Sequence, residues 1–260
     1  MPRIFSHRLA RDDYFQFMQS VQLHGNAGLL RNWLRDHHVE TEALKRAFLN
    51  SRSQLGQDIV MLLLLNFTGE ERPGIFLEFG AADGIVNSNT YSLEKELGWS
   101  GLLCEPGRGW HKSLKFNRSC TVSQKLVGAR TGDNTTFYEN QDGELSGSIN
   151  KGTRDIVSQY NLQTISLDDL LQSHSLQRVE YLSIDTEGSE LSILSEFSFG
   201  VRPKFFSVEH NYSPDRIKIE MLMIENGYKR IQTRLSHFDD WYYDEGPINK
   251  KFLNFLEGFK

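Results

Sequence analysis

The sequence predicts an α/β fold in which helices cover both faces of a mainly parallel sheet. Between residues 75 and 230, short apolar segments alternate with segments that carry apolar residues at helical spacing, and this alternation indicates a parallel sheet. The first apolar segment, 75–80, leads straight into a turn with glycines at Gly80 and Gly84. Because glycine permits sharp turns and the close approach of a ligand, this turn is the strongest candidate for a binding site at the carboxyl edge of the sheet.

The composition is that of a folded globular protein. The 260 residues are 38% hydrophobic and 24% charged, which argues against disorder and suits one large domain, alone or with an appendage. The net charge is −5 and no basic face is evident, so we expect no nucleic-acid partner. The longest apolar run, 59–65, is too short to span a bilayer.

The cysteines and the first residues indicate a cytoplasmic protein. Cys104 and Cys120 both lie in apolar, strand-like segments, where we expect buried thiols and neither a disulfide nor a metal site. The N-terminal sequence lacks the apolar core of a secretory signal.

Three parts of the chain are predicted. Apolar residues at helical spacing predict helices in residues 1–70, and no linker rich in proline, glycine or serine separates them from the first strand. These helices therefore form a cap on a domain that spans 71–245. The tail, 246–260, is expected to pack on the body or on a partner, and either the N-terminal helices or the tail supports a possible homo-oligomer. The apolar residues of the tail share one helical face and are Phe252, Phe255, Leu256 and Phe259.

The alternating region divides into strands and helices as follows. The predicted strands cover residues 75–80, 101–106, 120–128, 179–185, 204–209, 228–233 and 238–243. The predicted helices cover residues 89–97, 109–117, 189–197 and 214–226.

The ends of the first and the last of these helices are marked by glycines, Gly98 and Gly227. Ser213 is the expected N-cap of the last helix, and Pro214 occupies its first position. Its expected apolar stripe consists of Ile217, Met221 and Ile224.

The segment 129–165 is polar and rich in turns. It has short β-like pieces at 136–138 and 164–167, and its stretch 145–149 is the expected place of a substrate lid.

Acidic residues near the glycine turn favour a nucleoside ligand with a cationic group. Glu105 ends the next strand, 21 residues after Gly84, and is placed to accept hydrogen bonds from a ribose. Glu78 and Asp83 lie beside the turn, where carboxylates would repel a pyrophosphate. They suit a cationic ligand such as the amino group of S-adenosylmethionine.

Two further strand ends supply candidate catalytic groups. Asp185 and Glu187 follow one strand, and Glu209 and His210 end another. A carboxylate or an imidazole can act as a general base, so Asp185 and His210 are the two candidates. A divalent cation held by Asp185, Glu209 and His210 is an open alternative.

Several motifs, in the same order along the chain, resemble those of the FkbM-type methyltransferases. The resemblance covers residues 53–231, and neither the first 50 residues nor the tail contributes to it. The matching segments are Ser53–Asp58, Phe76–Gly84, Ser88–Pro106, Ser183–Leu191 and Val208–Asn211.

The resemblance implies a Rossmann-like class I methyltransferase fold with a mainly parallel seven-stranded sheet. It implies S-adenosylmethionine as the methyl donor and O-methylation of a hydroxyl group on a sugar, a glycan or another small natural product. Glu105 would hold the ribose and Asp185 would lie beside the reacting methyl group, while Ala82 stands where class I enzymes often carry glycine. The residues assigned to the cofactor are Glu78, Gly80, Ala82, Asp83, Gly84, Asn89, Glu105, Pro106 and Asp185.

Two other functions remain compatible with the sequence. A binding or scaffold protein would keep the fold without the reaction. An NAD-dependent oxidoreductase would use the same turn for a dinucleotide, although the turn lacks the Gly-x-Gly-x-x-Gly spacing.

Overall fold

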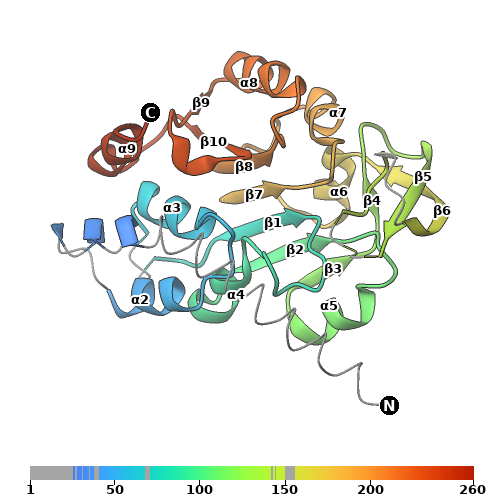
Figure 1. Cartoon of the computed structure of the whole chain (residues 1–260), viewed down its shortest axis with the longest axis horizontal. Coiled ribbons are helices and arrows are strands. Elements are labelled where there is room, and N and C mark those ends of the chain that lie inside the picture. Colours follow the sequence, from blue (N-terminus) through green and yellow to red (C-terminus); the bar gives the residue numbers. More distant parts are fainter. Residues whose placement is uncertain are drawn as a thin grey trace.

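A seven-stranded sheet forms the centre of the molecule (Figure 1). The computed structural model describes residues 26, 28–30, 32–34, 36, 37, 41–67, 71–141, 143, 145–149 and 156–260. The strand order is β3-β2-β1-β7-β8-β10-β9, and β10 alone runs antiparallel to its neighbours. This order confirms the predicted class I methyltransferase fold. The strands are β1 (Ile75–Phe79), β2 (Ser100–Cys104), β3 (Thr121–Ser123), β7 (Tyr181–Ile184), β8 (Phe205–Glu209), β9 (Tyr228–Arg230) and β10 (Asp239–Asp244).

The strand order creates a crevice between β1 and β7. The chain passes from β1 outward to β2 and β3, and it then returns to place β7 on the other side of β1. The two strands are parallel neighbours, with Phe79 in register with Ile184. Ligands of open α/β sheets bind outside the carboxyl ends of the strands at such a reversal. A ligand site is therefore expected at the residues that follow Phe79 and Ile184.

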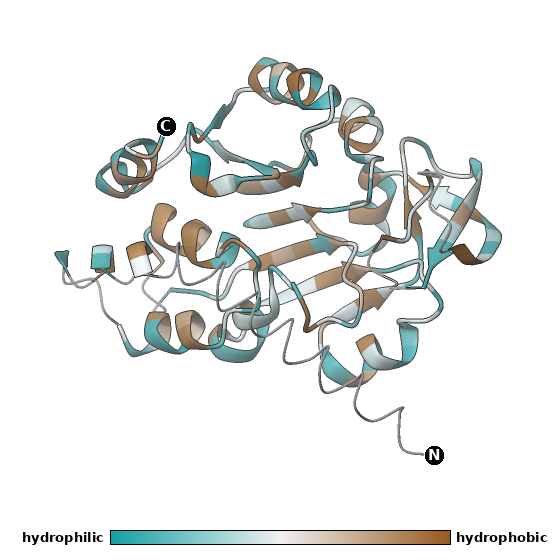
Figure 2. Cartoon of the chain, in the orientation of Figure 1, coloured by the Kyte–Doolittle hydropathy of each residue, from teal (hydrophilic) through white to brown (hydrophobic). Residues whose placement is uncertain are grey.

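Helices cover both faces of the sheet, and each face buries alternate residues of the strands. In β1, Phe76 packs in one apolar cluster and Leu77 in the other, because successive side chains of a strand point to opposite faces. Figure 2 shows apolar segments in the sheet and in the helices that cover it. One face carries α2 (Glu42–Leu49), α3 (Gln57–Leu64), α4 (Tyr91–Leu97), α5 (His111–Asn117) and α9 (Lys250–Glu257). The other carries α6 (Leu167–Ser173), α7 (Glu190–Ser195) and α8 (Asp215–Glu225).

The two ends of the chain that were predicted to be helical both join the first cluster. Every residue of α3 is buried. In α9, Phe252 and Leu256 are fully buried beside Trp33, so the tail packs on the body as predicted. The N-terminal helices predicted before residue 26 lie outside the described residues. The division of the chain at residues 70 and 245 stays a prediction.

The segment after β3 differs from the sequence prediction. The single strand expected over 120–128 is wrong, because Gln124 and Lys125 separate β3 from β4 (Leu126–Val127), which belongs to a second sheet. This small sheet has the order β4-β6-β5, with β5 (Asn134–Asn140) and β6 (Ile156–Ile165) antiparallel. Helix α6 was not predicted, and it begins where Ser166 accepts a hydrogen bond from the Asp169 N–H.

Helix α8 buries a different face from the one predicted. Its buried residues are Ile219 and Met223, whereas Ile217, Met221 and Ile224 are each more than half exposed. Ser213 does not cap the helix, whose N-cap position is occupied by Pro214. Within the part of the chain that the structure describes, no helix has the length and apolar character needed to cross a membrane.

Candidate active site

Two adjoining pockets open at the carboxyl ends of the central strands. The first has a volume of about 530 Å³ and is called the Glu105 pocket, since Glu105 and Pro106 lie in its wall. The second has a volume of about 880 Å³ and is called the Glu209 pocket. The residues common to both pockets are Phe79, Gly80, Ala82, Asp185 and Glu187. The pockets therefore meet at the crevice between β1 and β7.

The turn after β1 requires glycine at Gly80. This residue has a φ of 78°, and a Cβ atom there would lie 1.9 Å from the backbone oxygen of Asp185. No larger residue fits between the two strand ends. Ala82 has a φ of 44°, in the left-handed region that favours glycine. Ala82 therefore holds a conformation that glycine adopts more readily.

Glu105 connects the turn to the end of β2. One of its carboxylate oxygens accepts a hydrogen bond from the Ala82 N–H at 2.8 Å, and the other accepts from the Gly107 N–H at 2.7 Å. Burial raises the pKa of Glu105 to about 7, although these two hydrogen bonds lower it. Glu105 is thus a fixed acceptor in the wall of its pocket.

Asp83 and Gly84 shape the turn but line neither of the two pockets. The Asp83 carboxylate accepts hydrogen bonds from the Ile85 and Val86 N–H groups, at 2.8 and 2.9 Å. A Cβ atom on Gly84 would lie 2.6 Å from the side chain of Arg118. Both residues therefore stabilise the conformation of the turn, and their contact with a cofactor stays a prediction.

Glu78 is buried and already has several partners. It accepts hydrogen bonds from Ser88, from the Asn89 N–H and from Thr90, and it lies 3.7 Å from the Arg118 guanidinium. These contacts fix the loop between β1 and α4 against the sheet. Glu78 thus lines the Glu209 pocket as a constrained carboxylate.

Asn89 lines the same pocket and has one free polar atom. Its Nδ2 donates to the Ser183 Oγ at 2.9 Å. Its Oδ1 is buried and has no hydrogen-bond partner among the described residues. A buried acceptor without a partner is costly in a folded protein, so a ligand that donates a hydrogen bond fits this position.

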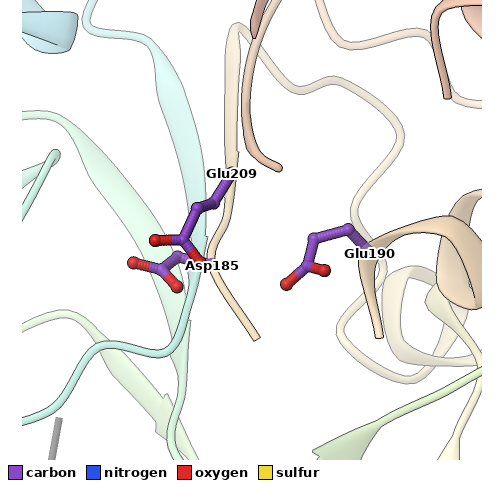
Figure 3. Close-up of side chains that lie close together, drawn as sticks. All are labelled: Asp185, Glu190 and Glu209. Carbon is purple, nitrogen blue, oxygen red and sulfur yellow. The ribbon is translucent and has the colours of Figure 1, made fainter. Parts of the chain in front are cut away.

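Three carboxyl groups meet where β7 and β8 end (Figure 3). Asp185, Glu190 and Glu209 each offer an oxygen within 4.8 Å of the others. Figure 3 shows the carboxyl groups of Asp185 and Glu209 side by side, with Glu190 pointing towards them from the start of α7. One oxygen of Glu190 already accepts hydrogen bonds from Thr186 and Gly188.

The pKa values of Asp185 and Glu209 are both raised, so their ionised forms are disfavoured. Burial and the nearby Glu187 carboxylate raise the pKa of Glu209 to about 8. Burial and the Glu209 carboxylate raise the pKa of Asp185 well above its usual range. The two groups share a hydrogen bond, so near neutral pH the pair holds a proton.

His210 lines neither pocket, and its role as a base stays a prediction that the structure does not favour. Its Nδ1 accepts a hydrogen bond from the Tyr212 N–H at 2.9 Å, and its Nε2 lies 3.9 Å from the Asp240 carboxylate. Burial lowers its pKa. Strand β8 ends at Glu209, so His210 lies beyond the strand, and of the two residues Glu209 alone lines one of these pockets. Glu190 takes the place of His210 in the predicted metal-binding trio.

The Glu209 pocket also contains residues that were not among the predicted site residues, and Gln54, Asn211, Leu145 and Phe238 are examples. Gln54 and Asn211 lie within segments that carry the family resemblance, but the sequence alone gave them no contact with the site. Leu145 belongs to the predicted lid segment, and Phe238 directly precedes β10. Only the chain reversals of the fold bring these residues together, so no spacing in the sequence signals them.

A family model described as "Methyltransferase FkbM domain" matches residues 78–242. The chain belongs to this family. The protein is therefore an S-adenosylmethionine-dependent methyltransferase, as the sequence resemblance implied. The position of α4 does not fit a dinucleotide site, because this helix begins seven residues beyond Gly84. No helix N-terminus directly follows the turn to receive a dinucleotide pyrophosphate.

Solved structures of other methyltransferases are similar to this chain at low identity. A precorrin-6y C5,15-methyltransferase from Geobacter metallireducens is 10% identical, with a TM-score of 0.42 over 75% of this chain and 92% of that one. A SAM-dependent methyltransferase from Aquifex aeolicus is 9% identical, with a TM-score of 0.37 over 78% and 98%. No curated protein matches the sequence.

Proposed function

We propose that the protein methylates a hydroxyl oxygen of a sugar, a glycan or another small natural product. The observation that carries this proposal is the Asp185–Glu209 pair. Asp185 lines both pockets, and Glu209 lines the larger one. A proton-accepting pair at the junction of a donor pocket and an acceptor pocket is the arrangement that methyl transfer to a hydroxyl needs.

The donor is assigned to the Glu105 pocket and, for its methionine end, to the adjoining part of the Glu209 pocket. S-adenosylmethionine supplies a methyl group already activated by its sulfonium. Glu105 would accept hydrogen bonds from the ribose, and Pro106 lines the same pocket. Gly80 and Ala82 leave room at the methionine end, where Glu78 and the free Oδ1 of Asn89 suit its ammonium group.

The Asp185–Glu209 pair accepts the proton of the acceptor hydroxyl. As the oxygen–carbon bond forms, the carbon–sulfur bond breaks and its electron pair leaves with the sulfur. The leaving group therefore needs no acid, but the hydroxyl proton needs an acceptor. The raised pKa of Glu209, about 8, makes it a stronger base than an exposed glutamate. The remaining task of the protein is to align oxygen and methyl.

The acceptor is assigned to the remaining part of the Glu209 pocket. The amide side chains of Gln54, Asn87 and Asn211 line it and can both donate and accept hydrogen bonds. Leu145 and Phe238 add apolar surface. This combination suits a hydroxyl-rich ring, in which polar edges alternate with apolar faces.

A divalent cation is a second way to lower the pKa of the hydroxyl. Asp185, Glu190 and Glu209 offer only oxygen ligands, which suit Mg²⁺ or Mn²⁺. Methyl transfer in excess EDTA separates the two mechanisms. The base mechanism predicts unchanged activity, whereas loss with recovery in Mg²⁺ or Mn²⁺ assigns the three carboxylates to a cation.

Titration calorimetry tests the donor assignment first. S-adenosylmethionine and S-adenosylhomocysteine are expected to bind with micromolar affinity, and NAD is expected not to bind. Methyl transfer to a panel of glycosides and hydroxylated natural products, followed with labelled S-adenosylmethionine, then tests the reaction. Binding without transfer to any acceptor, including material that copurifies with the protein, would favour a scaffold. Absence of donor binding at millimolar concentration would refute the proposal.

A further inference from the structure

The small sheet is fastened to the loop that follows Glu105. The Tyr160 hydroxyl, on β6, accepts a hydrogen bond from the Arg108 N–H at 3.1 Å. It donates towards the Glu139 carboxylate at 2.8 Å and lies 3.1 Å from the Pro106 backbone oxygen. The Arg108 guanidinium covers the Tyr160 ring at 3.9 Å from its centroid. The Tyr160 side chain thus contacts the loop at Pro106 and at Arg108.

Glu139, on β5, completes this attachment. Its carboxylate oxygen accepts from Tyr160 and also from the Gly109 N–H at 3.2 Å. Burial raises the pKa of Tyr160 to about 12, so its hydroxyl keeps the proton that it donates near neutral pH. A phenol that donates to a carboxylate forms a charge-assisted hydrogen bond, which is stronger than a neutral one.

The Tyr160 hydroxyl contacts the loop on both sides of Gly107, the residue that donates a hydrogen bond to Glu105. Tyr160 contacts Pro106 and Arg108, and the residue between them, Gly107, donates its N–H to the Glu105 carboxylate at 2.7 Å. A shift of the loop would therefore rotate the Glu105 carboxylate. Within the loop, Pro106 and Gly107 are buried, whereas Arg108 and Gly109 are exposed, so the contacts of Tyr160 and Glu139 attach its exposed half to the small sheet.

The same hairpin builds a wall of the pocket. Phe137 is buried in the Glu105 pocket, stands opposite Tyr160 in the β5–β6 register and packs on its ring at 5.7 Å between centroids. The connection between the two strands contributes Gly143 and Ser146 to this pocket and Leu145 to the Glu209 pocket. The small sheet thus contacts both the loop and the pocket wall.

We propose that Tyr160 and Glu139 are positioning residues of the donor site. They hold the loop 106–109 so that Glu105 presents its carboxylate to the donor ribose. The inference rests on the proposed function, in which Glu105 binds that ribose. Neither residue lines the Glu105 pocket, so both act through Glu105.

A binding cycle with two ligands tests this role. The ligands are S-adenosylhomocysteine and its 2′-deoxyribose analogue, and the measurement is titration calorimetry on the wild type and on Tyr160→Phe. Loss of one charge-assisted hydrogen bond predicts a rise of about tenfold in the Kd of S-adenosylhomocysteine. The Kd of the deoxy analogue should rise by about threefold or less, because part of its contact with Glu105 is already gone.

Tyr138→Phe is the matched control, because Tyr138 lies on the same hairpin and lines neither pocket. It is expected to change both Kd values by less than about twofold. Thermal unfolding without ligand shows that each variant is folded at the binding temperature. If Tyr160→Phe does not fold, Glu139→Gln replaces it, with an expected rise of about threefold for S-adenosylhomocysteine since a neutral acceptor remains.

Two outcomes overturn the proposal. Equal weakening of both ligands by Tyr160→Phe would mean that the hydroxyl stabilises the fold without positioning Glu105. An unchanged Kd for S-adenosylhomocysteine would mean that the loop holds itself. Failure of the wild type to bind S-adenosylhomocysteine is a different result, because it would refute the donor assignment and with it this inference.

Discussion

Two buried acidic groups lie close together in the sheet, and their surroundings are opposite. The Asp240 carboxylate on β10 accepts hydrogen bonds from Arg216 at 2.9 Å and from Arg230 at 3.2 Å. The carboxylates of Asp185 and Glu209 have other acids as neighbours. A buried charge that cations neutralise supports the fold, whereas buried charges without such partners oppose it. The comparison therefore favours a structural role for Asp240 and a role in the reaction for Asp185 and Glu209.

Replacing one acid of each group gives the sharpest test, and Asp185→Asn has the larger expected effect. This substitution removes one carboxyl group of the proton-accepting pair and keeps the shape. We expect methyl transfer to fall by about 10² to 10⁴-fold, measured as kcat with labelled S-adenosylmethionine. The Kd of S-adenosylhomocysteine is expected to change by less than about threefold. The variant is also expected to be at least as stable as the wild type, because it relieves repulsion between acids.

Glu209→Gln is the companion variant and should also reduce kcat strongly. Activity near the wild-type level in both variants would refute the assignment of the base. Full activity in one of them would identify the other residue as the acceptor.

Asp240→Asn should show the reverse behaviour. The substitution leaves two guanidinium groups without their shared carboxylate, and we expect the free energy of unfolding to fall by about 2 kcal/mol. This value is below that of a fully buried pair, because the Arg216 side chain is 35% exposed and solvent screens part of the interaction. Chemical denaturation measures the loss. A kcat within about threefold of wild type is the matching expectation, and a selective loss of kcat would break the comparison.

The comparison also shows what the sequence could predict. Most strands and helices of the central sheet, the glycine turn and the place of Glu105 at a strand end follow from local patterns, since periodicity and turn chemistry reside in neighbouring residues. The small sheet and α6 did not follow from them. The residue pair Glu209 and His210 looks like a single site in the sequence. In the structure β8 ends at Glu209, as predicted, and His210 follows the strand and lines neither pocket. The direction of a side chain just beyond a strand end does not follow from the local sequence.

The environment of an acid is a second property that the sequence does not reveal. Asp185, Glu209 and Asp240 are all acidic residues near a strand, and nothing local distinguishes them. Arg216 and Arg230 reach Asp240 from α8 and β9, whereas Glu190 faces Asp185 from α7. Whether an acid meets cations or other acids is decided by chain segments that are distant in sequence.

The pH dependence of kcat distinguishes the Asp185–Glu209 pair from Asp240. Below the pKa of Glu209, kcat is expected to fall by about tenfold per pH unit. Since burial and nearby acids raise the pKa of Glu209 to about 8, most of it is protonated at pH 7 and cannot accept a proton. We expect kcat to increase with pH and to level off above about 8. Asp240→Asn should leave this midpoint unchanged. A profile that is flat between pH 6 and 9 would contradict the role of the carboxyl pair, provided that donor binding is saturated throughout.

His210→Gln has the smallest expected effect on activity, a change in kcat of less than about threefold. His210 is in contact with Asp240 and Tyr212 and lines neither pocket. The Gln side-chain oxygen can accept the Tyr212 N–H in place of Nδ1, so we expect a loss of about 1 kcal/mol in the free energy of unfolding. The same kcat assay and denaturation measure both quantities. A large loss of kcat in a folded variant would move the base to the α8 face of the sheet. A small loss of kcat would assign His210 a structural role beside Asp240. The proton-accepting groups would then be restricted to those that line the pocket with Glu209.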